Sequence, residues 1–293
     1  MTSTSALTCA MLSAALVSAC TGSADSSLGS SSLPGSSTTP ETTINYVALG
    51  DSYAAFGSAN APTTGPKSCH RATDNYPSNI MKSSKIKGTD ASCGGAKTDH
   101  ILAEWDRGGG ELIPAQADSL RSDTELVTLS ISGNDIEFGT LTDCFMDIGQ
   151  HPGAATCESR LGAKTDALYA ALPAKLDAVH EEIKRRSPNA RVIVTGYYAL
   201  ATASGACPAA GSMTVSDRQW IADLTSRLNT IVSDAGSRHG AEFVLPANTD
   251  QHTVCAAPAQ RWVDGTGQDT GSVPMHPTAL GQKTMANAVL AKL

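Results

Sequence analysis

Apolar residues in this chain form short continuous runs that alternate with longer segments of helical periodicity. Such runs, bounded by Gly, Pro or polar residues, are typical of buried β-strands. We therefore predict strands over residues 44–49, 125–131, 191–195 and 241–245, with a weaker one over residues 86–92.

Between these runs, apolar residues recur three and four positions apart, which predicts helices. The longest spans residues 164–186, where Pro173 is expected to kink or split it. Ser216 is a suitable N-cap for a second helix that ends near residue 238, and Pro277 suits the first turn of a final helix that ends near residue 290. Two shorter helices are expected over residues 98–105 and 115–120.

This alternation of strands and helices predicts an α/β sandwich with a mainly parallel sheet. Ligands of such sheets bind beyond the carboxyl ends of the strands. Three polar or glycine-rich loops follow predicted strands, over residues 50–52, 93–95 and 132–135. We expect all three loops at one edge of the sheet.

The N-terminal segment has a different composition from the rest. Residues 1–19 contain no charged side chain, not even the basic residue expected before an apolar core, and end in small residues, which indicates a signal peptide. Residues 16–20 resemble a lipobox, so we expect Cys20 to be lipidated; ordinary cleavage after Ala19 is the alternative. Residues 20–42 are a tether rich in Ser, Gly, Thr and Pro. The folded domain is expected over residues 43–293.

Charge and cysteine content narrow the function further. The net charge is -7, which argues against nucleic-acid binding because phosphate-tracking grooves need clustered cations. Six of the eight cysteines fall in the expected domain, an even number that suits a disulfide framework in an exported protein. Their spacing predicts three local pairs: Cys69–Cys93, Cys144–Cys157 and Cys207–Cys255. Neither CxxC nor HExxH occurs, and we expect no metal and no cofactor.

Four separated blocks carry the candidate chemistry. GDSYAAFGS contains Ser52, ASCGGAKTDHIL contains Gly95 (with Gly94 as the alternative register), LSISGNDIEFG contains Asn134, and VPMHPTALGQ contains His276. With these blocks in this order, the chain resembles the GDSL or SGNH hydrolases, and in particular their secreted, disulfide-containing actinobacterial esterase/lipase branch. The resemblance runs from about residue 46 to residue 290.

The resemblance implies a three-layer α/β/α sandwich with a flavodoxin-like sheet of about five strands. It also implies a serine esterase, of the lipase or phospholipase A type, that cleaves carboxylic esters through an acyl-Ser52 intermediate. His276 would be the base, and the oxyanion would bind the Ser52 N–H, the Gly95 N–H and the Asn134 amide. A carbohydrate or cell-wall O-acetylesterase is the alternative, and a non-catalytic binding lipoprotein is a more distant one.

One position departs from the family pattern. The family usually has an Asp three residues before the catalytic His, but Val273 stands there. We expect the Val273 carbonyl to orient His276 in a Ser–His dyad, with Asp269 and Asp264 as alternatives. The partner is expected to be a lipid or small acyl ester. We expect a monomer, exported or held at the cell surface, that meets a membrane only through an N-terminal lipid.

Overall fold

The computed structural model describes residues 43–293. Five parallel strands form one sheet in the order β4-β1-β7-β8-β9, which confirms the predicted α/β fold. Their bounds are β1 Ile44–Gly50, β4 Ile86–Asp90, β7 Leu126–Ser130, β8 Arg191–Thr195 and β9 Glu242–Val244. All five residues of β7 are buried, as expected for a central strand that is covered on both faces.

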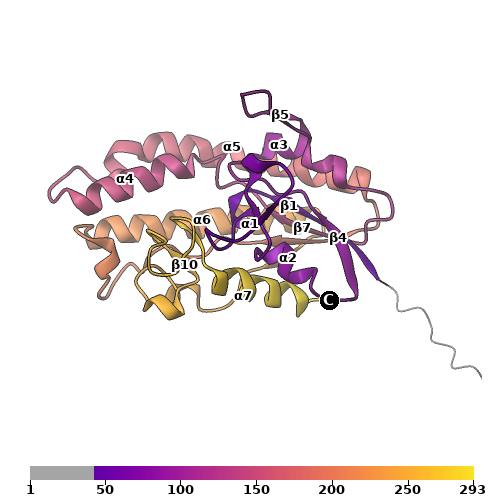
Figure 1. Cartoon of the computed structure of the whole chain (residues 1–293). Helices are drawn as coiled ribbons and strands as arrows, with labels where there is room; N and C mark the ends of the chain where they lie inside the picture. Colours follow the sequence, from indigo (N-terminus) through magenta and orange to yellow (C-terminus); the bar gives the residue numbers. More distant parts are fainter. Residues whose placement is uncertain (1–42) are drawn as a thin grey trace, which may run out of the picture. The chain divides into compact units, whose positions relative to one another are not determined.

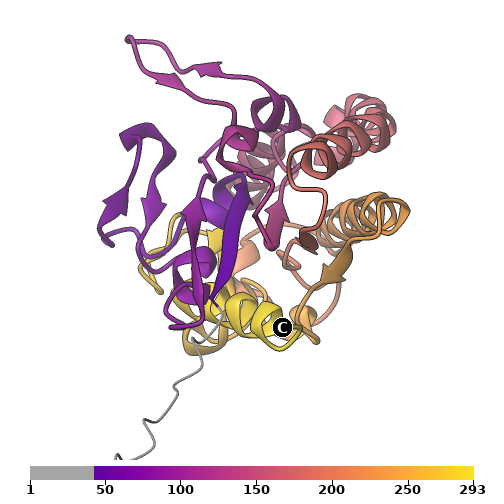
Figure 2. The same cartoon turned by 90° about the vertical axis from the view of Figure 1, so that its right-hand side faces the viewer.

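Helices cover both faces of the sheet (Figure 1). Helices α2 (Tyr76–Ile80) and α7 (Ala279–Leu290) pack together on one face. Figure 2 shows α5 (Cys157–Arg186) and α6 (Val215–Arg238) side by side on the other face, where α3 (Thr98–Leu102) contacts α5. Leu172, Leu176 and Val179 of α5 are buried, as their helical spacing predicts.

The helix boundaries differ from the prediction for local reasons. Helix α5 begins at Cys157, after the N-cap Thr156, and continues through Pro173. Helix α6 begins two residues earlier than predicted because Thr214 and Asp217 form a capping box. Thr278 is the N-cap of α7, and Pro277 lies just before it in strand β11.

Helix α4 (Phe138–Gln150) was not predicted. It packs against α5, and the Cys144–Cys157 disulfide joins the two helices. The other cysteines of the domain pair as Cys69–Cys93 and Cys207–Cys255, so the structure has the three disulfides that the spacing predicts.

The remaining elements are short. Helix α1 is Ser52–Ala55. Three two-stranded antiparallel pairs flank the sheet: β2 (Thr63–Thr64) with β3 (Arg71–Ala72), β5 (Trp105–Asp106) with β6 (Leu112–Ile113), and β10 (Val263–Asp264) with β11 (His276–Pro277). The segment predicted as a helix over residues 115–120 is a 3₁₀ turn, Gln116–Ser119.

A buried glutamine joins the last helix to the beginning of the domain. Gln282 of α7 donates to the carbonyls of Tyr53 and Phe56 at 2.9 and 2.7 Å. Its side-chain oxygen accepts from the Tyr76 N–H at 2.8 Å. Helix α7 is therefore bonded directly to the segment that follows β1.

The segments predicted as a signal peptide and a tether, with Cys20, lie outside the described residues. Within residues 43–293, no helix has the length and apolar character needed to cross a membrane.

Candidate active site

Ser52 lies where the central strand β1 ends. The carboxylate of the preceding residue, Asp51, caps helix α1 by accepting the Tyr53 N–H at 2.9 Å. Asp51 also accepts the Tyr197 hydroxyl at 2.6 Å, and that hydroxyl accepts the Gly133 N–H at 2.9 Å. Burial raises the pKa of Asp51 to about 7, although these hydrogen bonds oppose the shift. Asp51 thus braces the loop, and its carboxylate is not among the hydrogen-bond partners of His276.

His276 meets Ser52 across the sheet edge. Its Nε2 lies 2.7 Å from the Ser52 Oγ, which is hydrogen-bond distance for a general base and its nucleophile. Its Nδ1 lies 2.7 Å from the carbonyl oxygen of Pro274. Burial lowers the pKa of His276 to about 4, and the hydrogen bond to Pro274 acts in the opposite direction. The imidazole is therefore neutral at pH 7, as a base must be.

The prediction of which carbonyl orients the His276 ring is wrong. The Val273 carbonyl accepts the His276 backbone N–H at 3.2 Å, and the Pro274 carbonyl faces Nδ1. Met275 adopts a left-handed conformation with φ +60°, and this turn selects which carbonyl reaches the ring.

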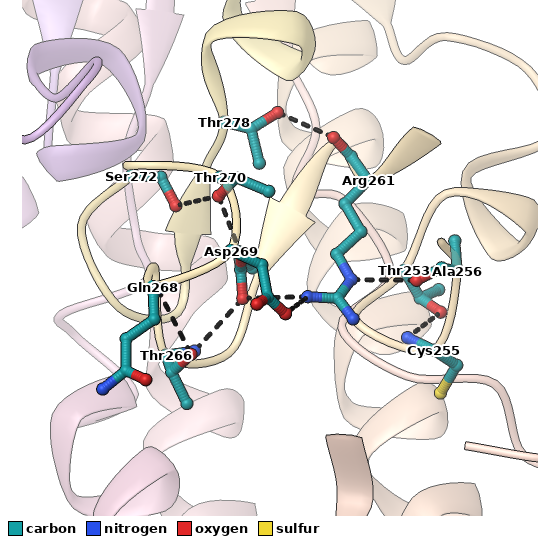
Figure 3. A network of polar contacts seen from close by, with 11 residues as sticks. Thr253, Cys255, Ala256, Arg261, Thr266, Gln268, Asp269, Thr270, Ser272 and Thr278 are labelled. Carbon is teal, nitrogen blue, oxygen red and sulfur yellow. Dashed lines mark hydrogen bonds and ion pairs between the residues drawn. The ribbon is translucent and has the colours of Figure 1, made fainter. Parts of the chain in front are cut away.

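The two candidate aspartates belong to a different network, in which Figure 3 labels Asp269, Arg261 and Thr270. Asp264 is buried, accepts the Thr270 hydroxyl at 2.7 Å and lies 3.4 Å from Arg261. Asp269 pairs with the same guanidinium at 2.8 Å. Neither carboxylate bonds His276, although Asp264 is its register partner in the β10–β11 pair and so helps to hold its backbone. Among residues 43–293, the hydrogen-bond partners of the His276 ring are thus the Pro274 carbonyl and the Ser52 hydroxyl.

Gly95 and Asn134 lie beside the same serine. Gly95 has φ +80°, which glycine adopts without strain. Asn134 donates one amide hydrogen to the Ala96 carbonyl at 2.9 Å, which leaves its second hydrogen available. In residues 43–293, neither the Ser52 N–H nor the Gly95 N–H has an acceptor. The Gly94 N–H, in contrast, donates to the Cys69 carbonyl at 3.0 Å, which favours Gly95 over Gly94 as the oxyanion donor.

These groups open into one cavity of about 480 Å³. Its lining includes Ser52, Gly95, Asn134 and His276. A second cavity, of about 380 Å³, adjoins it through four residues that line both: Met146, Gly265, Thr266 and Met275. Apolar side chains of the second cavity include Phe145, Leu200, Ile221 and Val254.

Helix α4, which was not predicted, supplies a wall to both cavities. Phe138, Thr142 and Met146 of α4 line the first, and Phe145 and Met146 line the second. Leu141, Phe145 and Ile148 have helical spacing and could have indicated this helix. Tyr197 lines neither of these cavities; it is buried, and its hydroxyl bonds Asp51.

Residues 43–293 contain no cluster of three or more His, Cys, Asp or Glu side chains suited to a metal ion. The arrangement of a hydroxyl, a neutral imidazole and unpaired amide donors can carry out acyl transfer with the side chains and backbone described above.

Comparison with known proteins supports this chemistry. The model of the GDSL-like lipase/acylhydrolase family matches residues 48–284. Lipase 2 of Streptomyces coelicolor is 34% identical over 253 residues, which are 83% of this chain and 84% of the relative. The crystal structure of an extracellular lipase from Streptomyces rimosus superposes with a TM-score of 0.70 and 28% identity, over 85% of this chain and 99% of that one. For phospholipase A1 from Streptomyces albidoflavus NA297 the TM-score is 0.66 and the identity 26%, over 86% and 100% of the two chains.

Proposed function

Because the chain belongs to the GDSL-like lipase/acylhydrolase family and is an ester hydrolase, we propose that Ser52 and His276 are its catalytic dyad. The observation that carries the proposal is the pair of contacts made by one imidazole. Nε2 lies 2.7 Å from the Ser52 Oγ, and Nδ1 lies 2.7 Å from the Pro274 carbonyl. With Nδ1–H donated to that carbonyl, Nε2 is left with its lone pair toward the hydroxyl.

The reaction proceeds in two halves. Nε2 of His276 takes the Ser52 proton while Oγ attacks the ester carbonyl, and the resulting imidazolium protonates the departing alcohol. Water then attacks the acyl-Ser52 ester with the same base, and Ser52 regains its proton as the carboxylic acid leaves. In both tetrahedral intermediates the oxyanion accepts hydrogen bonds from the Ser52 N–H, the Gly95 N–H and the Asn134 amide.

The second cavity favours an acyl chain longer than acetyl. Its apolar side chains begin where Met146 and Met275 separate it from the catalytic cavity. Removing each methylene from water contributes about 0.8 kcal/mol, so a chain that enters this cavity gains transition-state binding with every carbon. We therefore propose lipids or medium-chain esters as substrates. An O-acetylesterase would gain nothing from this cavity.

The test is a series of p-nitrophenyl esters from acetate to dodecanoate. We expect kcat/KM to rise with chain length until the cavity is full, and to fall to background in Ser52→Ala and His276→Ala. Met146→Trp should narrow the entrance and reduce activity on octanoate at least tenfold with little change on acetate, while Met146→Leu serves as the matched control. Wild-type activity equal to that of Ser52→Ala on every ester would refute the dyad, and activity on acetate alone would favour the O-acetylesterase.

We further propose that the protein is exported and held at the cell surface as a lipidated monomer. The support is the signal-like segment over residues 1–19, Cys20 at its end, and the three disulfides of the domain. Palmitate labelling of producing cells should be lost in Cys20→Ser; labelling that persists in this variant would exclude lipidation at Cys20. Sedimentation of the purified protein tests the monomer.

A further inference from the structure

Arg107 contacts the loop that carries Gly95 without lining the catalytic cavity. It follows strand β5, in the hairpin that projects from the domain (Figures 1 and 2). Its Nη1 donates to the Gly94 carbonyl at 2.6 Å, and its Nη2 donates to the Ser68 carbonyl at 3.2 Å. Gly95 lines the cavity, whereas Arg107 is not part of the lining.

The guanidinium is held in place by stacking. Its central carbon lies 4.1 Å from the ring centroid of Trp105, and Trp105 stacks on His100 with centroids 3.9 Å apart and planes 7° from parallel. Within the described part of the chain, Arg107 forms no ion pair with a carboxylate. Its side-chain hydrogen bonds go to two backbone carbonyls, those of Gly94 and Ser68.

Arg107 hydrogen-bonds the same peptide group that supplies the oxyanion donor. The Gly94 carbonyl and the Gly95 N–H belong to the same trans peptide, so they point in opposite directions. A cation on the oxygen withdraws electron density and makes the N–H at the other end a stronger donor. We propose that Arg107 is a positioning residue that polarises the Gly94–Gly95 peptide toward the oxyanion. The inference rests on the proposed role of Gly95.

Arg107 is not needed merely to anchor this loop. The Cys69–Cys93 disulfide and the hydrogen bond from the Gly94 N–H to the Cys69 carbonyl hold its first half. Asn134 holds its second half through the Ala96 carbonyl. Loss of Arg107 should therefore leave the backbone in place and weaken the donor, so its effect belongs to the transition state.

The experiment compares Arg107→Met and Arg107→Lys with the wild-type enzyme on one ester. Loss of a whole oxyanion donor lowers kcat by about 10² to 10³, so for loss of polarisation alone we expect kcat/KM to fall about tenfold in Arg107→Met. Lys keeps the charge, so Arg107→Lys should recover most of that loss. Arg227→Met is the matched control, since Arg227 also stacks on an aromatic ring, Tyr169, but lies on α6 outside the cavity.

Two inhibitors distinguish polarisation of the peptide by Arg107 from a purely structural role of Arg107. An alkyl boronic acid forms a negatively charged tetrahedral adduct with Ser52, whereas a neutral amide with the same chain imitates the ground state. In Arg107→Met, the boronic acid should bind about tenfold more weakly and the amide should bind as before. The Gly95 amide proton should also shift upfield in the NMR spectrum, and should return in Arg107→Lys.

If the wild-type enzyme is active and the kcat/KM of Arg107→Met is within twofold of its value, the inference is overturned and the proposed function is left intact. Equal weakening of the boronic acid and the amide would also overturn it, because the loop would then have moved. Failure of the proposed function is a different result: wild type equal to Ser52→Ala on all esters, whatever Arg107 does.

Discussion

The acid limb of the pH–rate profile should lie unusually low for a histidine base. His276 acts only when it is neutral, and burial lowers its pKa from the ordinary 6.5 to about 4. The neutral Pro274 carbonyl raises this pKa less than a triad carboxylate would, because it carries no full charge. We therefore expect the limb that belongs to His276 to be complete above pH 6 and kcat/KM to be lost as the pH falls through about 4.

The activity at pH 5.5 distinguishes a lowered pKa of His276 from an ordinary one. At pH 5.5, a base with the ordinary pKa of 6.5 would be about 9% neutral, whereas one with a pKa near 4 would be about 97% neutral. The two cases thus differ by about tenfold in kcat/KM relative to the plateau. The lowered pKa of His276 also affects stability. As the pH falls below 6.5, the free energy of unfolding decreases, because His276 is protonated in the unfolded chain before it is protonated in the folded one.

The assay is a stopped p-nitrophenyl ester assay between pH 3.5 and pH 8, with near-UV circular dichroism to exclude unfolding. Asp51 titrates near pH 7 and could add a limb of its own. Tyr197→Phe removes a hydrogen bond that lowers the pKa of Asp51, so it should move such a limb upward and leave the one near pH 4 in place. A limb near 6.5 that Tyr197→Phe does not move would refute the reasoning about His276.

Three further predictions follow from the loops around the site. Asp264→Asn breaks a buried ion pair, so it should lower the free energy of unfolding in urea by about 3 kcal/mol. Asp269 is exposed, so Asp269→Asn should lower that free energy by less than about 1 kcal/mol and keep kcat within twofold. A large loss of kcat in Asp269→Asn would instead indicate that Asp269 belongs to a catalytic triad. Gly95→Ala should strain a backbone at φ +80° by about 1–2 kcal/mol and lower kcat, and an unchanged kcat would argue against this loop as the oxyanion site. Replacing Cys69 and Cys93 together by Ser should cost about 3 kcal/mol in thermal unfolding, since their bridge spans 24 residues; an unchanged melting temperature would contradict this.

Much of this fold was predictable because segments with an apolar pattern in the sequence are also the segments that are buried in the structure. The strand over residues 191–195 was predicted with its observed bounds, since its apolar run is buried in the sheet. Ser52, Gly95 and Asn134 could be placed together because each follows a strand, and parallel strands bring their carboxyl ends to one edge.

The details that were not predictable depend on contacts between distant segments or on turn geometry. Which carbonyl faces His276 depends on the left-handed Met275, and methionine gives no signal for that conformation. The N-cap of α6 is Thr214 because Asp217 completes a capping box, which outweighs the good intrinsic preference of Ser216. The second cavity forms where α4 meets loops from the far end of the chain, so no single segment encodes it.

The buried glutamine of α7 has a consequence for when activity arises. Ser52 and His276 are 224 positions apart, and Gln282 donates to the carbonyls of Tyr53 and Phe56, which follow Ser52. The nucleophile emerges early in synthesis, and its base and the helix that supports it follow much later. A growing or incompletely folded chain therefore has no functional dyad, and hydrolysis begins only when the final helix has docked.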